Sequence, residues 1–272
     1  MLLTIIIGKN SNLSNSLYMK LSNCTLLSSR DIIESIDVLS EFKNKNINII
    51  FNNFQPATEL NNIQGSSKYI KNSILSTSVV LDYFRGTKIN KIIYTSSSSV
   101  YGNNILCKED DDLKPLNLHA SLKVANEKLI EKYCIENNID YTIARIFNMY
   151  GGDDKFSIIS KIINMYINNE TLTIVNNGNA IRDFIHIDDV VEVYEKILNL
   201  QNVKTLNLGT GSGSSIKNIL DFLSNNGINI KTKNIYKDEL KTSTADTKLL
   251  SECTHKDHFV KIEDYLKKEL NL

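Results

Sequence analysis

The sequence predicts an α/β fold, in which a doubly wound parallel sheet is followed by a smaller C-terminal lobe. Short, wholly apolar runs recur along the first half, amphipathic segments lie between them, and this alternation changes after Gly151-Gly152. A chain of 272 residues is long enough for one or two domains. We therefore expect a sheet domain at residues 1–150, to which residues 181–202 return, and a lobe built from residues 151–180 and 203–272.

Apolar runs without polar alternation predict fully buried parallel strands. They are Leu2–Ile7, Cys24–Leu27, Ile47–Phe51, Lys91–Tyr94 and Tyr141–Ile146. Apolar residues at helical spacing predict helices, among them Lys71–Phe84 and Ser121–Glu136. Beyond Gly152 we expect helices at Ile158–Ile167 and Asp188–Leu200, a strand at Leu172–Val175 and a turn at Asn176–Gly178.

The composition argues against several classes of function. Lysine plus arginine equals aspartate plus glutamate, 31 each, so no net field attracts nucleic acid or an anionic membrane. No run approaches the roughly 18 apolar residues of a membrane span. The four cysteines are scattered without paired spacing, which predicts reduced thiols in a cytoplasmic protein. Cys253, His255, Asp257 and His258 stand close together, but without a second cluster they indicate a loop and not a metal site.

Two segments bring a hydroxyl, an imidazole and an ammonium group into one region of the predicted fold. Ser97 lies four residues before Tyr101-Gly102, just after the fourth predicted strand. A hydroxyl at the carboxyl end of a strand faces the crevice in which open α/β sheets bind ligands. His119 and Lys123 are four residues apart on one predicted helix and therefore share a face.

This layout resembles the active site of the extended short-chain dehydrogenase/reductases, the family of nucleotide-sugar epimerases, dehydratases and reductases. The resemblance implies a Rossmann-type domain that binds a dinucleotide and a lobe that binds a nucleotide sugar. In this family a Ser or Thr and a Tyr-x-x-x-Lys pair carry the proton chemistry. Ser97, His119 and Lys123 are thereby implied as catalytic residues, with histidine at the position of the tyrosine. Lys123 is also implied to bond the nicotinamide ribose.

Histidine at position 119 changes the expected chemistry. Its ordinary pKa near 6.5 needs no lowering, and the Lys123 ammonium favours the neutral ring. A neutral imidazole can donate an N–H bond to a carbonyl as an electrophile, or act as a base, with Ser97 or a water completing the relay. The alternative is that His119 is an exposed helix residue in a homologue that only binds its ligands.

The turn after the first strand resembles the family's GxxGxxG loop, whose backbone approaches the pyrophosphate at a helix N-terminus. Only the first glycine, Gly8, is kept, and serines occupy the two later positions, Ser11 and Ser14. Each serine adds a side chain where the backbone should pass close to phosphate, yet a hydroxyl can itself donate to phosphate. Gly8, Ser11, Asn12 and Leu13 are the cofactor-binding candidates of this loop.

The end of the second predicted strand distinguishes NADP from NAD. Ser28, Ser29 and Arg30 offer two hydroxyls and a guanidinium, which suit a 2′-phosphate, so NADP(H) is favoured. Asp31 follows directly, and a shift of register that brought it to the ribose would reverse the preference.

Further cofactor contacts are implied by resemblance. Asn52, Asn53 and Phe54, after the third strand, resemble the stretch that lines the adenosine side. Asn72, which opens the predicted central helix, matches an asparagine that the family uses there. Caps and turns favour asparagine equally, so a purely structural role stays open.

The longest stretch of resemblance is Gly178–Val190, similar to the family's Gly-x-x-x-Arg-Asp-Phe-Ile-His-Val-Asp-Asp. It implies that Arg182 binds the diphosphate of a nucleotide sugar, where a planar guanidinium suits phosphate oxygens. Asp183, His186 and Asp189 are interpreted as structural residues that hold the turn and cap the next helix.

Other substrate contacts come from two further segments. Arg145–Gly151 resembles the family's Arg-x-x-Asn-x-Tyr-Gly, which makes Asn148 a contact to the sugar nucleotide. Ser98, beside Ser97, is a further substrate-binding candidate. The resemblance covers almost the whole chain.

The expected activity is NADPH-dependent reduction of the 4-keto group of a nucleotide-linked 6-deoxysugar, of the dTDP-4-keto-6-deoxyhexose type, for surface polysaccharides. Two alternatives stay open: an NAD-dependent nucleotide-sugar 4-epimerase and a catalytically silent binder of sugar nucleotide or dinucleotide. The helices Lys71–Phe84 and Ser121–Glu136 resemble those that form a four-helix dimer interface in the family, so a homodimer is expected.

Overall fold

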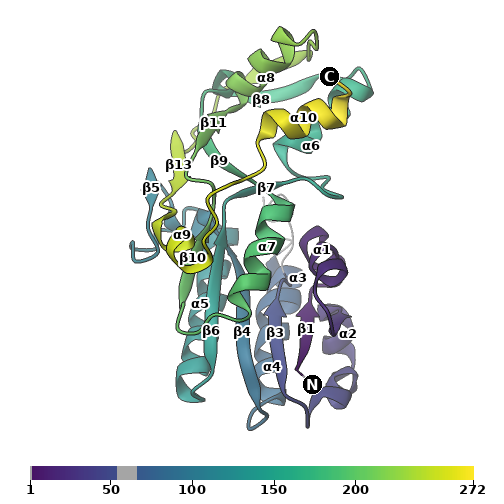
Figure 1. Ribbon diagram of the computed structural model, residues 1–272, viewed down its shortest axis with the longest axis vertical. Helices are drawn as coiled ribbons and strands as arrows, with labels where there is room; N and C mark the ends of the chain where they lie inside the picture. The colour runs from purple at the N-terminus through teal and green to yellow at the C-terminus, as the bar shows by residue number, and fades with distance from the viewer. Residues whose placement is uncertain (1, 54–65) are drawn as a thin grey trace. The chain divides into compact units, whose positions relative to one another are not determined.

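The computed structural model describes residues 2–53 and 66–272 and confirms the predicted α/β class (Figure 1). The chain divides into two compact units. The first unit comprises Met1–Val100, Pro115–Arg145 and Val191–Leu206. The second unit comprises Tyr101–Lys114, Ile146–Val190 and Asn207–Leu272. Of the segment expected to return to the sheet domain, residues 191–202 belong to the first unit and residues 181–190 to the second.

A six-stranded sheet in the order β10-β6-β4-β3-β1-β2 runs through the first unit. Its strands are β1 (Leu3–Ile7), β2 (Cys24–Leu27), β3 (Ile47–Phe51), β4 (Ile89–Ser97), β6 (Asp140–Ile146) and β10 (Thr205–Leu208). The central pairs, β2 with β1, β1 with β3 and β3 with β4, are parallel. The apolar runs form strands because both faces of the sheet are covered: every residue of β3 is buried.

Helices accompany these strands on both faces, as Figure 1 shows with α7 in front of the sheet and α4 and α5 behind it. They are α1 (Asn12–Lys20), α2 (Ser29–Glu34), α3 (Ser66–Ile70), α4 (Ser76–Tyr83), α5 (Leu118–Glu136) and α7 (Ile187–Ile197). Between α3 and α4 the helix continues as a π-helical turn, Lys71–Leu75, a form that occurs mostly as single turns at functional sites. The helix expected at Lys71–Phe84 therefore begins earlier, at Ser66, and its first expected residues, Lys71–Leu75, are π-helical.

The second unit contains two small sheets. One has the order β11-β9-β13-β5, with β7 also paired to β9, and the other pairs β12 with β8. The strands are β5 (Leu106–Cys107), β7 (Asn148–Tyr150), β8 (Leu172–Val175), β9 (Ile181–His186), β11 (Gly213–Ser215), β12 (Thr232–Ile235) and β13 (Thr242–Ala245). The helices are α6 (Ile158–Ile167), α8 (Ile216–Asn225), α9 (Lys248–Thr254) and α10 (Ile262–Leu270). Tyr150, Ile159, Ile162 and Leu223 are among the buried residues of its apolar core.

Candidate active site

The turn between β1 and α1 has the backbone geometry of a phosphate-binding loop. Gly8 has a φ of +122°, and a Cβ there would lie 2.2 Å from the Asn52 carbonyl oxygen, so only glycine fits. Ser11 is the N-cap of α1 and accepts a hydrogen bond from the Ser14 amide. Asn12 begins the helix, and Leu13 is buried beneath it. The N-terminal end of α1, with its helix dipole, suits an anion.

The two serines that replace glycines are held by one asparagine. The Asn52 side-chain amide donates to Ser11 Oγ at 2.7 Å and to Ser14 Oγ at 2.8 Å. Ser14 is fully buried, so its side chain lies inside the unit. The Oδ1 atom of Asn52 and that of Asn53 are buried acceptors without a hydrogen-bond partner among the described residues. Polar groups in this state are where ordered ligands or waters bind, so the loop fits a dinucleotide.

At the end of β2, Ser28 is the N-cap of α2. Its hydroxyl oxygen accepts from the Arg30 amide at 3.2 Å and from the Asp31 amide at 3.5 Å. Ser29 is half-buried, whereas Arg30 and Asp31 are exposed in the first turn of the helix. Since both charged side chains lie at the same helix end, this geometry does not choose between a 2′-phosphate and a 2′-hydroxyl.

Two of the candidates for the adenosine side, Asn52 and Asn53, directly follow β3. Asn53 donates to the Ser73 carbonyl at 3.0 Å and to Thr77 Oγ1 at 3.0 Å, which ties the strand to the helix that follows the π turn. Asn72 is half-buried in that turn, and its carbonyl accepts from Ser76 Oγ at 2.6 Å. Phe54 lies outside the described residues.

The three catalytic candidates lie in the first unit. Ser97 ends β4, and its hydroxyl oxygen accepts from the Ser99 amide at 3.2 Å. Ser98 begins the short 3₁₀ helix that follows. His119 and Lys123 lie in the first turns of α5 and are 8% and 0% exposed. His119 is thus buried, unlike the solvent-facing residue that a binding-only homologue would allow.

The Lys123 ammonium is enclosed by β4. Its Nζ donates to the Thr95 carbonyl at 2.7 Å and lies 5.2 Å from the centre of the Tyr94 ring. Burial lowers the pKa of Lys123 well below its ordinary value, and the Glu127 carboxylate opposes that shift. The ammonium is therefore easier to deprotonate than a surface lysine.

The His119 imidazole is neutral at pH 7. Burial first, and then the charge of Lys123, lower its pKa from 6.5 to about 4. A neutral ring keeps one N–H donor and one acceptor nitrogen. It can polarise a carbonyl or accept a proton, but it is not an imidazolium acid.

The lowered pKa of His119 makes stability pH-dependent. Above pH 6.5 the imidazole is neutral in the folded and the unfolded chain; between pH 6.5 and 4 only the unfolded chain binds the proton. The free energy of unfolding is therefore expected to fall by about 3 kcal/mol from this group as the pH drops through that window. Urea unfolding at pH 7.0 and 4.5 measures it. The His119→Phe variant should lose less stability on acidification than the wild type, and equal losses would contradict the expectation.

Behind the catalytic helix lies a buried ion pair that the sequence patterns did not single out. Arg145 on β6 and Glu127 on α5 approach to 2.9 Å, with side chains 7% and 4% exposed. The Ser96 hydroxyl donates to the same carboxylate. Glu127 lies one further helical turn beyond Lys123. This spacing was the only feature of the sequence that could have placed Glu127 on the same helix face as His119 and Lys123.

In the second unit, Asn148 on β7 donates to the Asp183 carbonyl at 3.0 Å. Arg182 on β9 donates to the Ile181 carbonyl and approaches Glu239 at 3.4 Å; its side chain is 22% exposed. Its guanidinium is therefore accessible and already opposite one carboxylate. These are the positions of the two predicted substrate contacts of this unit.

The residues interpreted as structural bind backbone groups. The Asp183 carboxylate is fully buried and accepts from the amides of Thr210, Gly211 and Ala245. His186 Nδ1 accepts from the Asp188 amide at 3.2 Å, at the start of α7. Asp189 pairs with Lys256 at 2.9 Å and accepts from the Val260 amide. Asp183 and Asp189 thus join separate segments of the second unit, whereas the hydrogen bond of His186 is local.

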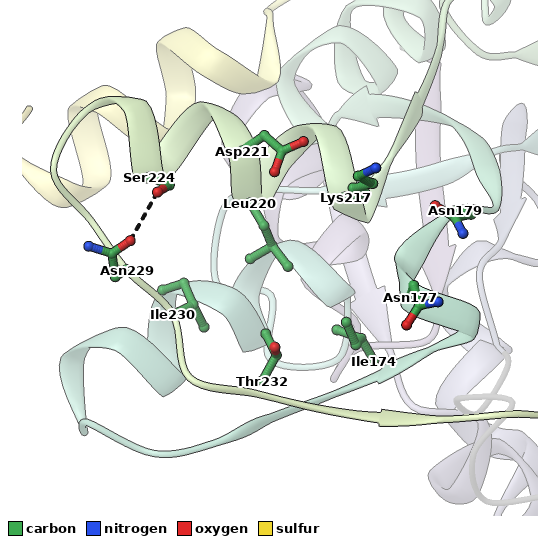
Figure 2. Close-up of a pocket in the computed structure, with 10 residues that line it drawn as sticks. All are labelled: Ile174, Asn177, Asn179, Lys217, Leu220, Asp221, Ser224, Asn229, Ile230 and Thr232. Carbon is green, nitrogen blue, oxygen red and sulfur yellow. Dashed lines mark hydrogen bonds between the residues drawn. The ribbon is translucent and has the colours of Figure 1, made fainter.

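Sequence reasoning did not anticipate a groove in the second unit. Figure 2 shows it between α8 and the β8–β12 pair, with Lys217, Leu220, Asp221 and Ser224 on the helix side. Its volume is about 500 Å³, within the range of small-molecule sites. Neither Asn148 nor Arg182 lines it.

Within residues 2–53 and 66–272, no group of three or more His, Cys, Asp or Glu side chains is arranged to hold a metal ion. Nor does that part of the chain contain a helix both long enough and apolar enough to cross a membrane.

Comparisons with known proteins identify the family. Residues 8–209 match the NAD dependent epimerase/dehydratase family. A dTDP-D-glucose 4,6-dehydratase of Dictyostelium discoideum is 28% identical over 195 residues, 66% of this chain and 45% of that protein. An ADP-L-glycero-D-manno-heptose-6-epimerase of Brachyspira hyodysenteriae is 32% identical over 225 residues, 76% of this chain and 69% of its own length. The chain spans about half the length of several other curated relatives.

Solved structures share the fold. A UDP-glucuronic acid 4-epimerase from Bacillus cereus, in complex with UDP-glucuronic acid and NAD, superposes with a TM-score of 0.85 at 21% identity, covering 100% of this chain and 98% of that one. A UDP-glucose 4-epimerase from Thermotoga maritima, with UDP-glucose, gives 0.83 at 19% identity, covering 100% and 98%.

Proposed function

Since the chain belongs to the NAD dependent epimerase/dehydratase family, we propose that it is an NADPH-dependent reductase of the 4-keto group of a nucleotide-linked 6-deoxysugar. The observation that carries the proposal is the buried pair of a neutral His119 imidazole and the Lys123 ammonium at the carboxyl edge of the sheet. The proposed role belongs to the synthesis of surface polysaccharides in the cytoplasm.

A bound nicotinamide dinucleotide would supply the hydride chemistry. The amides at the start of α1, with Gly8 and Ser11, would hold its pyrophosphate. Ser11 Oγ already accepts from Asn52 and from the Ser14 amide, so its own hydrogen is left to donate to phosphate. Lys123 would bond the nicotinamide ribose, which is the role of the matching lysine in the family. We propose NADP(H) as this dinucleotide because Ser28, Ser29 and Arg30 bring hydroxyls and a guanidinium to the start of α2.

The neutral His119 ring is proposed to donate its N–H to the oxygen of the substrate carbonyl. That bond strengthens as negative charge develops on the oxygen, which stabilises the transition state. The proton that completes the alcohol would come through the Ser97 hydroxyl. Reduction in one direction suits this arrangement, because a reversible epimerisation needs a group that both removes and returns a proton.

In the second unit, Arg182 and Asn148 are proposed to bind the sugar nucleotide. The Arg182 guanidinium is partly exposed and pairs with the Glu239 carboxylate. A bound diphosphate would take the place of that carboxylate as the anionic partner of Arg182. Ser98 would contact the sugar. The sugar, its nucleotide base and the dTDP-6-deoxy-4-keto assignment rest on the fold family.

A nucleotide-sugar 4-epimerase with NAD is the second candidate. It is favoured by the similar structures: the UDP-glucuronic acid 4-epimerase from Bacillus cereus is in complex with NAD, and the Thermotoga maritima structure is also a 4-epimerase. A silent binder is the third candidate, and the replacement of glycines by Ser11 and Ser14 favours it.

Turnover of a panel separates these candidates. The protein is mixed with NADPH or NADH and dTDP-, GDP-, CDP- and UDP-4-keto-6-deoxysugars, while absorbance at 340 nm is followed. We expect loss of absorbance with at least one sugar, faster with NADPH than with NADH. A parallel incubation with NAD⁺ and UDP-hexoses that carry a C4 hydroxyl tests for the epimerase, since a 4-keto sugar has no stereocentre at C4 to invert. Inversion at C4 without net cofactor use identifies an epimerase, and binding of both ligands without any change identifies a binder; either outcome overturns the reductase.

We further propose a homodimer through two helical segments of each chain, the continuous helix from α3 to α4 and α5. Exposed apolar side chains on these two segments support it: Ile70, Leu75, Leu118 and Ile135 are 37–64% exposed. Apolar side chains of this size favour burial against a partner.

A further inference from the structure

Two buried tyrosine rings lie directly behind the proposed catalytic pair. The Tyr69 ring packs edge-on against the His119 imidazole, with ring centres 5.8 Å apart and an angle of 73° between the planes. The Tyr94 ring lies under the Lys123 ammonium, with Nζ 5.2 Å from its centre. Both tyrosines are at most 1% exposed. Edge-to-face and cation–π contacts of this kind fix the direction of the groups they touch.

One polar link joins the segments that carry these contacts. Asn126 on α5, fully buried, donates to Ser73 Oγ in the π turn at 2.9 Å. The Tyr69 and Tyr94 hydroxyls have no standard hydrogen bond among the described residues, although Ser73 lies close enough to lower the pKa of Tyr69 and Asn126 that of Tyr94. Burial outweighs this effect and raises the pKa of both phenols, so both stay neutral. The rings therefore act through shape and dipole, not through charge.

We propose that Tyr69 is a positioning residue for His119: its ring holds the imidazole in one orientation and keeps water away from it. The proposal rests on the proposed function for its effect on rate, but not for its effect on the imidazole. Histidine has two rotatable bonds, and a neutral ring can donate from only one nitrogen, so its orientation decides which atom a carbonyl meets. The contact comes from α3, a segment whose sequence gave no sign of a role at the site.

The surroundings of His119 explain what loss of the ring would do. Among the described residues, the groups that face the imidazole include the Lys123 ammonium from its own helix and the neutral Tyr69 phenol from α3. Lys123 stays in place when Tyr69 is changed, because Thr95 and Tyr94 on β4 hold it. Removing the ring therefore changes the solvation of the imidazole and its freedom to rotate, while the nearby charge is unchanged.

The test compares Tyr69→Leu with Tyr69→Phe. Phenylalanine keeps the ring contact, whereas leucine removes it. A ¹³C label in the histidine rings reports the imidazole titration by NMR, and the His119→Phe spectrum assigns the signal. With leucine we expect the pKa of His119 to rise from about 4 toward 6.5, and kcat to fall about 10- to 100-fold with a smaller change in KM. With phenylalanine we expect both to stay near wild type.

Tyr133→Leu is the matched control. Tyr133 is also a buried tyrosine, 8% exposed, further along α5 in the apolar core of the first unit. It should lose stability without moving the His119 titration. If Tyr69→Leu does not fold, Tyr69→Met is measured in its place.

An unchanged His119 titration in the folded Leu or Met variant would overturn the proposal, and so would an equal shift in Tyr133→Leu. If the wild type turns over no sugar in the panel, the proposed function fails, and the titration still decides the positioning role.

Discussion

Replacing His119 by phenylalanine is expected to lower kcat by about 100- to 1000-fold, because the side chain that we propose to contact the substrate oxygen loses its N–H donor. The ring is buried at the start of α5, so phenylalanine fills its volume and the packing against Tyr69 is kept. KM and the dissociation constant of the dinucleotide should change much less, since binding uses other groups. Steady-state kinetics and calorimetric titration with NADPH measure both quantities.

Two variants control this result. His119→Gln keeps an N–H donor of similar reach and should lose only about 10-fold in kcat. His258→Phe removes a histidine whose side chain is 97% exposed in the second unit and should leave the rate unchanged. If the His119→Phe variant were as fast as the wild type, His119 would have no catalytic role.

Replacing Glu127 by alanine should destabilise the protein by about 3–5 kcal/mol, because the Arg145 guanidinium is left buried without its carboxylate. The Ser96 hydroxyl loses its acceptor at the same time. This cost is large against the total stability of an ordinary domain. The midpoint of urea unfolding, followed by circular dichroism, measures it.

The matched control for this change is Glu131→Ala on the same helix. Its ion pair with Lys128 is solvent-exposed and contributes at most about 1 kcal/mol. A double variant, Glu127→Leu with Arg145→Met, should recover part of the loss, since the Arg145 charge is removed together with that of Glu127. The rest of the loss should persist, because the buried Lys123 ammonium still lacks the Glu127 carboxylate. A loss below about 1 kcal/mol for Glu127→Ala would show that the guanidinium finds another partner or reaches water.

The strands and several helices could be predicted from the sequence because their burial is local and complete. Ile47–Phe51 is a continuous apolar run, and the strand has the bounds that the run predicts. The helix at Ile158–Ile167 and the strand at Leu172–Val175 also begin and end at the expected residues. In each case the apolar pattern alone carries enough information.

Elements that depend on distant partners could not be predicted in this way. Ile181–His186 reads as a mixed polar motif, yet it is a strand, because β7, β11 and β13 pair with it. The π turn at Lys71–Leu75 likewise has no periodicity of its own. Local propensity is too weak to decide such segments, and tertiary pairing overrides it.

In the candidate site, too, residues close in sequence could be predicted and contacts between distant segments could not. Resemblance pointed to His119 and Lys123, which are four residues apart on one helix and share their surroundings. It did not point to Tyr69, and it placed Arg145 in a motif without indicating its ion pair with Glu127. Nothing in the sequence near His119 indicates which ring will face it. These contacts exist only once α3 and β6 have packed against α5.

Deuterium transfer measures directly whether this chain delivers a hydride to a sugar carbonyl beside His119. The wild type is incubated with NADPH carrying deuterium at both C4 positions of the nicotinamide and with the 4-keto sugar that the panel selects. We expect a reduced sugar heavier by one deuterium, in step with the fall in absorbance, and almost none of it with His119→Phe. A sugar that stays unlabelled while both ligands are bound would show that no hydride is delivered.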